Sequence, residues 1–183
     1  MAKKISIAQI FLWLYVVVLG ITIGGGLYEQ LVVMPLWSLS PPDSVIAYHQ
    51  HNVANPQFAP DQGGRFWIFF SPGLGLLAIA TLISGWKTQP QHRRLRMIST
   101  IISLIVIVFT FAWFIPNIIT LTGEGVTKLS GEQITGLTNW WVRLNWVRAV
   151  LYSAAWIAGM YALTIPPMTD GGISAERSPT VNE

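Results

Sequence analysis

Four polar side chains share one face of an otherwise apolar segment near the end of the chain. Trp141, Asn145, Arg148 and Tyr152 follow the spacing i, i+4, i+7, i+11 of a helix face. An arginine near the centre of a membrane helix costs about 2.5 to 3.5 kcal/mol to insert, so it should face the interior and have a partner. Glu29, within the first apolar segment, is the natural partner. Such a set is more polar than a tie between two helices needs, and it indicates a functional pocket.

Further polar residues lie where the ends of four alternating helices would meet. They lie at the start of the second apolar segment, at the end of the third and at the start of the fourth. We predict catalytic roles for Glu29, Asn145 and Arg148, and substrate-binding roles for Arg65, Asn117, Trp141, Arg143 and Tyr152. The alternative is a purely structural pair that joins the first helix to the fourth, although buried ion pairs are weak evidence of net stability.

A metal site is a second hypothesis for the same end of the molecule. His49, His51 and Glu29 have the composition of a two-histidine, one-carboxylate iron site, and copper would also accept imidazole ligands. A helix over residues 43–55 would point the two histidines about 200° apart, so this site needs an irregular loop. We therefore expect no cofactor, with a non-haem iron or copper ion as the alternative. The absence of cysteine excludes disulfides, thiolate nucleophiles and iron–sulfur clusters.

The composition is that of a membrane protein. Of the 183 residues, 52% are hydrophobic and only 10% are charged, against about 25% charged in soluble domains. Segments 5–34, 66–86, 95–120 and 140–165 approach or exceed the roughly 20 residues that cross a bilayer, and lipid requires them to be helical. The expected fold is all-α: one domain, residues 1–165, forming a four-helix antiparallel bundle in the membrane. A short interfacial helix is expected over 43–55, and a disordered cytoplasmic tail over 166–183.

The distribution of basic residues predicts the orientation. They precede the first segment and crowd the connection between the second and third: Lys3, Lys4, Lys87, Arg93, Arg94 and Arg96. These ends should be cytoplasmic, so we expect a multi-pass protein of the bacterial inner membrane with both termini inside and the His49 loop outside. The net charge of +3 then reflects topology, and no nucleic-acid partner is expected.

Two further expectations concern the interior of the bundle. Small residues at four-residue spacing should let helices approach closely: Gly20 and Gly24 in the first segment, and Ala155 and Gly159 in the fourth. Polar residues should be concentrated in the outer half, with almost none in the cytoplasmic half.

Several short motifs are similar to those of the anthrone-oxygenase-like family of small four-helix membrane proteins. They are Val33-Met34-Pro35-Leu36-Trp37, Asn55-Pro56-Gln57-Phe58, Ile115-Pro116-Asn117 and Trp141-x-Arg143-x-Asn145-x-x-Arg148. The resemblance covers residues 5–165. It implies a four-helix bundle and cofactor-independent oxygenation of polycyclic phenolic anthrones to quinones.

The candidate residues are compatible with that chemistry. A base such as Glu29 would remove a proton from an anthrone or hydroquinone, Arg148 and Asn145 would stabilise the anion, and Trp141 and Tyr152 would stack on its rings. The expected partners are therefore a small hydrophobic aromatic molecule and membrane lipid. The alternative is a non-catalytic protein that binds a lipid, quinone or pigment, as a homo-oligomer or as an accessory subunit of a membrane complex. A metal-dependent oxidase that uses His49, His51 and Glu29 is the second alternative.

Overall fold

The computed structural model describes residues 6–56, 64–86, 88 and 90–165, and this part of the chain is helical, without strands. In order the elements are α1 (Ile7–Tyr28), η1 (Glu29–Val33), α2 (Pro35–Ser38), α3 (Asp43–Ala54), α4 (Gly64–Ser84), α5 (Pro90–Phe109), η2 (Thr110–Phe114), α6 (Ile115–Thr122), η3 (Glu124–Lys128) and α7 (Gly131–Thr164). The all-helical class predicted from the sequence is confirmed for these residues.

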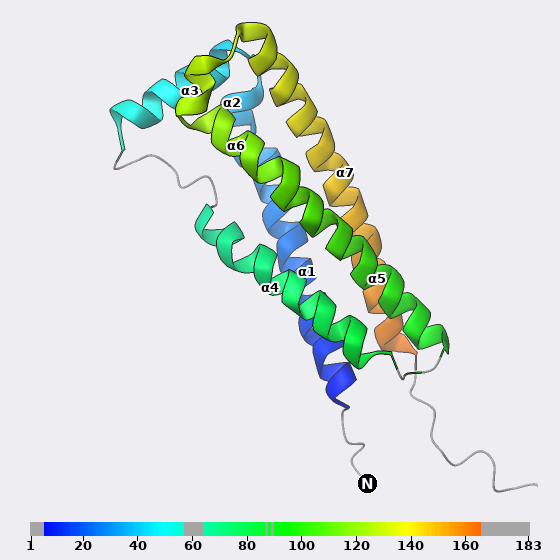
Figure 1. The fold of residues 1–183 in the computed structure, drawn as a ribbon. Helices are drawn as coiled ribbons and strands as arrows, with labels where there is room; N and C mark the ends of the chain where they lie inside the picture. The colour runs from blue at the N-terminus through cyan, green and yellow to red at the C-terminus, as the bar shows by residue number, and fades with distance from the viewer. Residues whose placement is uncertain (1–5, 57–63, 87, 89, 166–183) are drawn as a thin grey trace, which may run out of the picture.

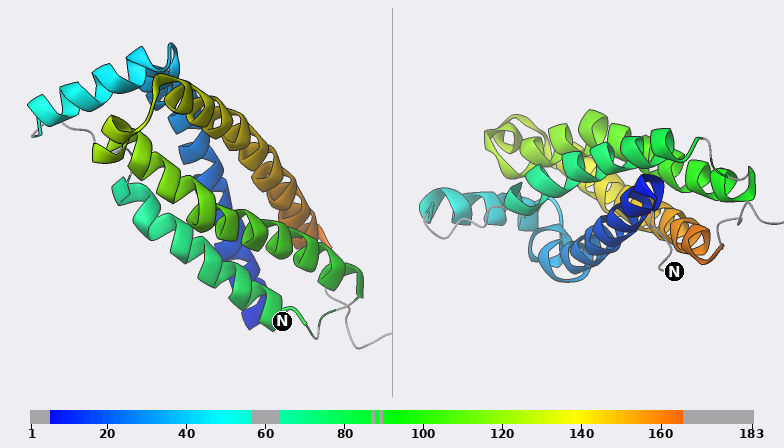
Figure 2. Two further views of the ribbon diagram at one scale, coloured as in Figure 1. Left: turned by 45° about the horizontal axis from the view of Figure 1, so that its top comes forward. Right: turned by 90° about the horizontal axis from the view of Figure 1, so that it is seen from below.

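Four long helices pack side by side. α1 packs against α4 and α7, and α5 packs against the same two helices (Figure 1). The views in Figure 2 show α3 projecting from one end of this group, beyond the end of α4. The predicted short helix in the first connection is therefore present, and Val45 and His49 provide its buried face.

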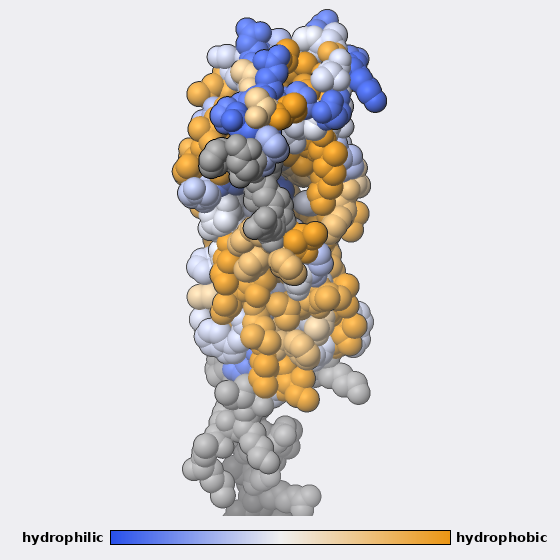
Figure 3. All heavy atoms as spheres, turned by 90° about the vertical axis from the view of Figure 1, so that its left-hand side faces the viewer, coloured by the Kyte–Doolittle hydropathy of each residue, from blue (hydrophilic) through white to orange (hydrophobic). Residues whose placement is uncertain are grey.

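Among the described residues, three helical stretches are long and apolar enough to cross a membrane. They are Ile7–Ser38, Phe66–Ser84 and Pro90–Thr122. Large apolar side chains on their outer faces are exposed in the isolated chain, and Figure 3 shows hydrophobic residues along much of one face. This is the surface expected of a protein whose solvent is lipid.

The fourth predicted segment, residues 140–165, begins earlier than expected and is less apolar. Ser130 and Gln133 form a capping box, in which the Gln133 amide N–H donates to Ser130 Oγ and the Gln133 side chain accepts from the Ser130 N–H. α7 therefore starts at Gly131, which makes Arg148 about 26 Å from the start of the helix at ~1.5 Å per residue. The boundary predicted at residue 140 overlooked this cap.

A π turn follows α1 and another follows α5, namely η1 and η2. Each of them ends two residues before a proline. Pro35 and Pro116 have no N–H, and their rings would collide with the carbonyl four residues before them in a regular helix. The preceding residue in each case bonds five residues back: Met34 N–H to the Glu29 carbonyl at 2.8 Å, and Ile115 N–H to the Thr110 carbonyl. Each proline thus creates a π turn that begins six positions before it.

The opposite end of the helix group contains a buried hydroxyl network. The Tyr15 hydroxyl lies 2.7 Å from Ser103 Oγ and 2.9 Å from the Ser99 carbonyl, and Ser99 Oγ donates to the Ala155 carbonyl at 2.6 Å. The expectation that polar residues would be almost absent from this half was wrong. Serine and tyrosine hydroxyls are small enough to be satisfied by helix carbonyls, so they need no cavity.

The predicted small-residue contacts hold at three positions of four. A Cβ on Gly159 would lie 2.9 Å from Val16 Cγ2, and one on Gly20 would lie 3.1 Å from Trp156 Nε1. Ala155 is fully buried. Gly24 is wrong as a packing position, because it faces outward and no heavy atom lies within 4 Å of its Cβ direction.

The contrast between two of these glycines gives a matched test of packing. Gly159→Ala should destabilise the protein by about 1 to 3 kcal/mol, because the new methyl group collides with α1. Gly24→Ala makes the same chemical change in open space and should leave stability unchanged or slightly higher. Denaturant titration of both variants in detergent measures the difference; equal effects would mean that α1 and α7 are not in close contact at Gly159.

Candidate functional site

An ion pair joins the first and last long helices. Arg148 Nη2 of α7 lies 3.8 Å from Glu29 Oε2 of η1, and the two side chains are only 11% and 14% exposed. This confirms the pairing predicted from the cost of each charge in lipid. At 3.8 Å the contact is electrostatic rather than a close hydrogen bond, and Glu29 Oε2 makes no hydrogen bond to any described residue. One buried carboxylate oxygen is therefore able to accept a proton or a hydrogen bond from a bound molecule.

Aromatic rings hold the arginine from two sides. Its Cζ lies 5.4 Å from the ring centroid of Trp67 and 4.6 Å from that of Phe114. Both distances are within the range of cation–π attraction, which strengthens when the cation is removed from water. Trp67 is also a hydrogen-bond partner of the Glu29 carboxylate. The guanidinium is thus held between an aromatic residue of α4 and one of η2, beside its carboxylate partner.

A cavity of about 570 Å³ opens beside this pair, between α4 and the continuous stretch from η2 to α6. Few of the residues that line this cavity are charged or polar, and most of its wall is aromatic or aliphatic. It is lined by Glu29, Trp67, Ile68, Ser71, Pro72, Thr110, Phe111, Phe114, Ile115, Ile118, Ile119, Thr122, Trp141 and Arg148. An apolar cavity with a few convergent polar groups is the usual composition of a small-molecule site.

Irregular backbone surrounds the cavity on three helices. The π turns η1 and η2 place Glu29 and Thr110 on its wall, and Pro72 interrupts α4 there. Since Pro72 cannot donate, the carbonyl of Ile68 lacks the N–H that a regular helix would supply. Irregular backbone at membrane depth is tolerated where it lines a cavity, and π turns are frequent at functional sites.

The rim of the cavity is open on the side that lipid would cover. Ile68 is 68% exposed and Ile119 is 63% exposed, and both line the cavity. Phe111 lies on the same rim. A hydrophobic molecule dissolved in the bilayer would therefore reach the ion pair without crossing water.

Two of the predicted residues on α7 lie beside the cavity rather than on its wall. The Asn145 side-chain amide donates to Met34 Sδ at 3.1 Å and is buried among residues of the first helical stretch. Tyr152 lies one turn beyond Arg148, is also buried, and is close enough to Arg148 to interact with its charge. Trp141 does line the cavity, and its indole N–H donates to the Phe114 carbonyl at 3.4 Å. The predicted helix face is thus present. Trp141 and Arg148 line the cavity, whereas Asn145 and Tyr152 are packed behind it.

Two of the other predicted substrate-binding residues, Asn117 and Arg143, are not brought to the cavity wall. Asn117 donates to the carbonyl of Trp113 on its own helix at 2.7 Å, and Arg143 is exposed on the outside of α7. Arg65 belongs to the first turn of α4, and its side chain is outside the described part of the structure.

The structure does not bring together the metal ligands predicted from the sequence. His49 is buried, with Nδ1 3.2 Å from the Thr122 carbonyl, and lines a separate cavity of about 500 Å³ between α3 and the start of α7. His51 is exposed. Because residues 43–54 form a regular helix, two histidines two positions apart point in different directions. Among the described residues, no three histidine, aspartate or glutamate side chains are grouped closely enough to hold a metal.

Sequence reasoning missed the residues of α4, η2 and α6 that form most of the cavity. Trp67 and Phe114 were not among the predicted site residues. The spacing of two prolines was the available signal: Glu29 and Thr110 each precede a proline by six positions. Interpreted as the cause of π turns, these two prolines would have identified Glu29 and the η2 wall of the cavity, but not the α4 wall.

Comparison with known protein families shows to which family this chain belongs. The family model of anthrone oxygenase matches residues 66–158, which include α4, α5, α6 and the part of α7 that carries Arg148. The chain belongs to the anthrone oxygenase family. No curated protein and no solved structure matches it. The matched region contains most of the cavity wall of this anthrone oxygenase family member, whereas Glu29 lies outside it.

The ion pair can be tested by a double-mutant cycle. Arg148→Ala leaves Glu29 as an uncompensated buried charge, and we expect a loss of stability of about 3 to 5 kcal/mol in the buried limit. Adding Glu29→Gln removes that charge, so the double variant should recover part of the loss. Unfolding in detergent by denaturant measures all four proteins.

Arg143→Ala is the matched control, because it removes an exposed arginine from the same helix. It should change stability by less than about 0.5 kcal/mol. Strictly additive losses from the two buried substitutions would contradict a direct interaction between Glu29 and Arg148.

Proposed function

We propose that this protein is a membrane oxygenase that acts on a flat phenolic molecule of the anthrone or hydroquinone class, within the cavity beside Glu29 and Arg148. The observation that carries the proposal is the buried, loosely held ion pair on the wall of an aromatic cavity that is open toward lipid. A tie between two helices would need neither the cavity nor the irregular backbone around it. Membership of the anthrone oxygenase family supports the choice of substrate class.

The aromatic walls favour a flat, apolar substrate. Trp67 and Phe114 already flank the guanidinium, and both rings face the space that a substrate would enter. A polycyclic ring system in this space would gain contact with both walls, and its oxygen atom would be directed toward Arg148. The apolar lining would exclude water and strengthen each electrostatic interaction in the site.

The proposed reaction needs a base and an anion-stabilising cation. Glu29 Oε2 accepts a proton from the methylene carbon of the anthrone, and the charge moves to the ketone oxygen, where Arg148 stabilises it. Dioxygen then adds to that carbon, and the resulting peroxide anion takes the proton back from Glu29. Loss of water from this hydroperoxide, with the second hydrogen of the same carbon, leaves the second carbonyl. One oxygen atom enters the quinone, the other leaves as water, and two C–H bonds are broken. No external electron donor is required.

We further propose that α1, α4, α5 and α7 form a four-helix antiparallel membrane bundle, with α7 as the fourth span. At 34 residues α7 is long enough, and its buried polar side chains face the other helices rather than lipid. The basic residues Arg93 and Arg94 next to the α4–α5 connection support a cytoplasmic position for that end. The cavity would then lie in the outer half of a bacterial inner membrane.

Oxygen consumption tests the catalytic proposal. The purified protein in detergent or nanodiscs should accelerate oxygen uptake by an anthrone and yield the quinone in equal amount. Glu29→Gln should lower the rate by about 10² to 10⁴-fold, the range for loss of a general base. Arg148→Gln should lower it by about 10² to 10³-fold, as for loss of one oxyanion-stabilising donor.

Glu132→Gln and Lys128→Gln are matched controls, since both replace exposed charges outside the cavity. Each should retain wild-type activity. Tight binding of the anthrone without oxygen uptake would instead favour the non-catalytic binding protein. Wild-type rates in folded Glu29→Gln and Arg148→Gln proteins would exclude this pair from the chemistry.

The orientation can be tested independently of activity. Because the chain has no cysteine, single cysteines at Ser44 and Gln91 give unambiguous labels. An impermeant thiol reagent applied to intact cells should label the cysteine at position 44 and spare the one at position 91. The reverse pattern would show that the α4–α5 connection faces outward.

A further inference from the structure

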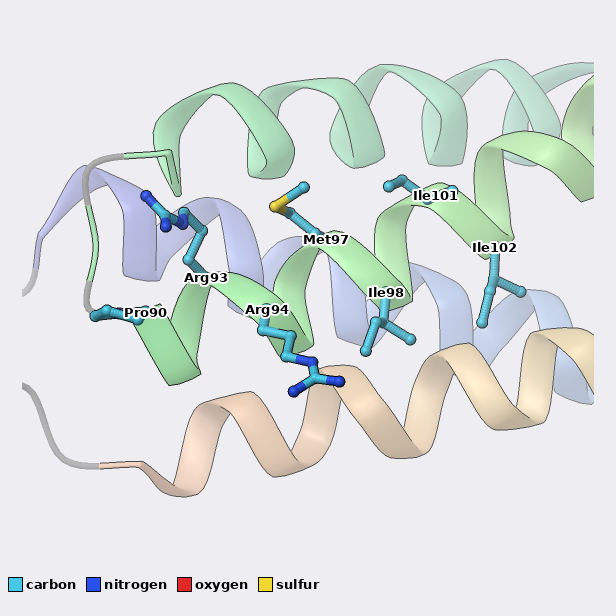
Figure 4. Close-up of a pocket in the computed structure, with 7 residues that line it drawn as sticks. All are labelled: Pro90, Arg93, Arg94, Met97, Ile98, Ile101 and Ile102. Atoms are coloured by element: carbon cyan, nitrogen blue, oxygen red, sulfur yellow. The ribbon is translucent and has the colours of Figure 1, made fainter.

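A third cavity, of about 550 Å³, lies along the outer face of α5 near the start of that helix. This end of α5 is the end farther from α3 and α6 (Figure 1). Two rows of side chains form it, each with the helical spacing i, i+4, i+8. One row is Arg93, Met97 and Ile101, and the other is Arg94, Ile98 and Ile102. Figure 4 shows the first row directed toward α4 and the second toward α7.

Each row has a charged residue at its start and apolar residues after it. Rows of this spacing form ridges on a helix surface with a groove between them. Ile98 and Ile101 are each 41% exposed, so the apolar part of the groove is accessible rather than covered by a neighbouring helix. The surface therefore offers two guanidinium groups followed by two turns of apolar contact.

The two arginines are available for a ligand. Both are exposed, and among the described residues neither forms an ion pair with a carboxylate. Arg96, one turn away, shows the contrast: it is buried, and its guanidinium donates to the Ala8 carbonyl at 2.9 Å and to His92 Nδ1 at 3.0 Å. Arg96 thus joins α5 to α1, whereas Arg93 and Arg94 are exposed on the surface.

The order of charge and apolar surface matches the structure of a lipid. α5 begins at Pro90 and has no charged residue after Arg96, so Arg93 and Arg94 lie where the span meets the membrane boundary. A phospholipid has its phosphate at that level and its acyl chains directly below. Guanidinium groups bind phosphate with two parallel hydrogen bonds.

We propose that this groove is a binding site for one anionic phospholipid, with the phosphate held by Arg93 and Arg94 and an acyl chain along the groove that ends at Ile101 and Ile102. The net negative charge of the headgroup distinguishes this lipid from a zwitterionic one, because two exposed guanidinium groups are concentrated at one point. The site is distant from Glu29 and Arg148 and does not depend on the proposed catalytic function.

Thermal unfolding of the full-length protein in detergent tests the site with defined lipids. Phosphatidylglycerol and phosphatidylcholine with identical acyl chains are titrated in parallel, and glycerol phosphate is titrated as the headgroup without chains. We expect phosphatidylglycerol to raise the unfolding temperature at concentrations at least fivefold lower than phosphatidylcholine, and glycerol phosphate to have no effect. Equal potency of the two lipids, or protection by glycerol phosphate alone, would overturn the proposal.

Variants separate this groove from general attraction to a basic protein. The double substitution Arg93→Gln, Arg94→Gln should remove the preference for phosphatidylglycerol, as should Ile98→Trp, which fills the groove and leaves both charges. Lys128→Gln removes an exposed charge at the other end of the molecule and should keep the preference. Native mass spectrometry should find one retained phosphatidylglycerol on the wild type. An unchanged preference in either folded groove variant would contradict the assignment.

Discussion

The charge of Arg148 constrains the structure around it more than any other feature. In the proposed membrane bundle, a guanidinium at the middle of the 34-residue α7 cannot reach water at either end of the helix, so it must be neutralised where it lies. Glu29 supplies the opposite charge from η1, and the rings of Trp67 and Phe114 supply attraction from two further elements. One side chain thus fixes the relative positions of α7, η1, α4 and η2.

The backbone of the neighbouring helices is irregular where it lies beside the charge of Arg148. A regular helix through Pro35 or Pro116 would force its ring against a carbonyl, and the π turn that relieves this collision also rotates the residues before it. Glu29 and Thr110 occupy the first positions of these turns, and both line the cavity. The described residues of the opposite half contain no π turn: there Tyr15, Ser99 and Ser103 satisfy one another, and Gly159 permits close packing. One half of the molecule is therefore closed by packing, and the other contains a site.

Much of the fold and the central pair could be predicted from the sequence, for physical reasons. Long apolar segments must be helical in lipid, and a buried arginine requires a carboxylate, so α1, α4, α5 and the Glu29–Arg148 pair follow from composition and spacing. The start of α7 at Gly131 was missed because a polar helical extension carries no apolar signal, although Ser130 and Gln133 form its cap. Asn145 could not be separated from the cavity by periodicity alone, since its direction depends on a contact with Met34, more than a hundred residues away in the chain. The metal hypothesis was wrong about geometry because helical residues two apart diverge.

The central claim is that the cavity beside Arg148 holds a flat, oxygen-bearing aromatic molecule, and an experimental structure with an anthraquinone bound tests it most directly. The account predicts density for one ring system between α4 and η2, against Trp67 and Phe114, with a carbonyl oxygen within hydrogen-bonding distance of the Arg148 guanidinium. Density in the cavity beneath α3 instead, or a ring system with no contact to Arg148, would contradict it.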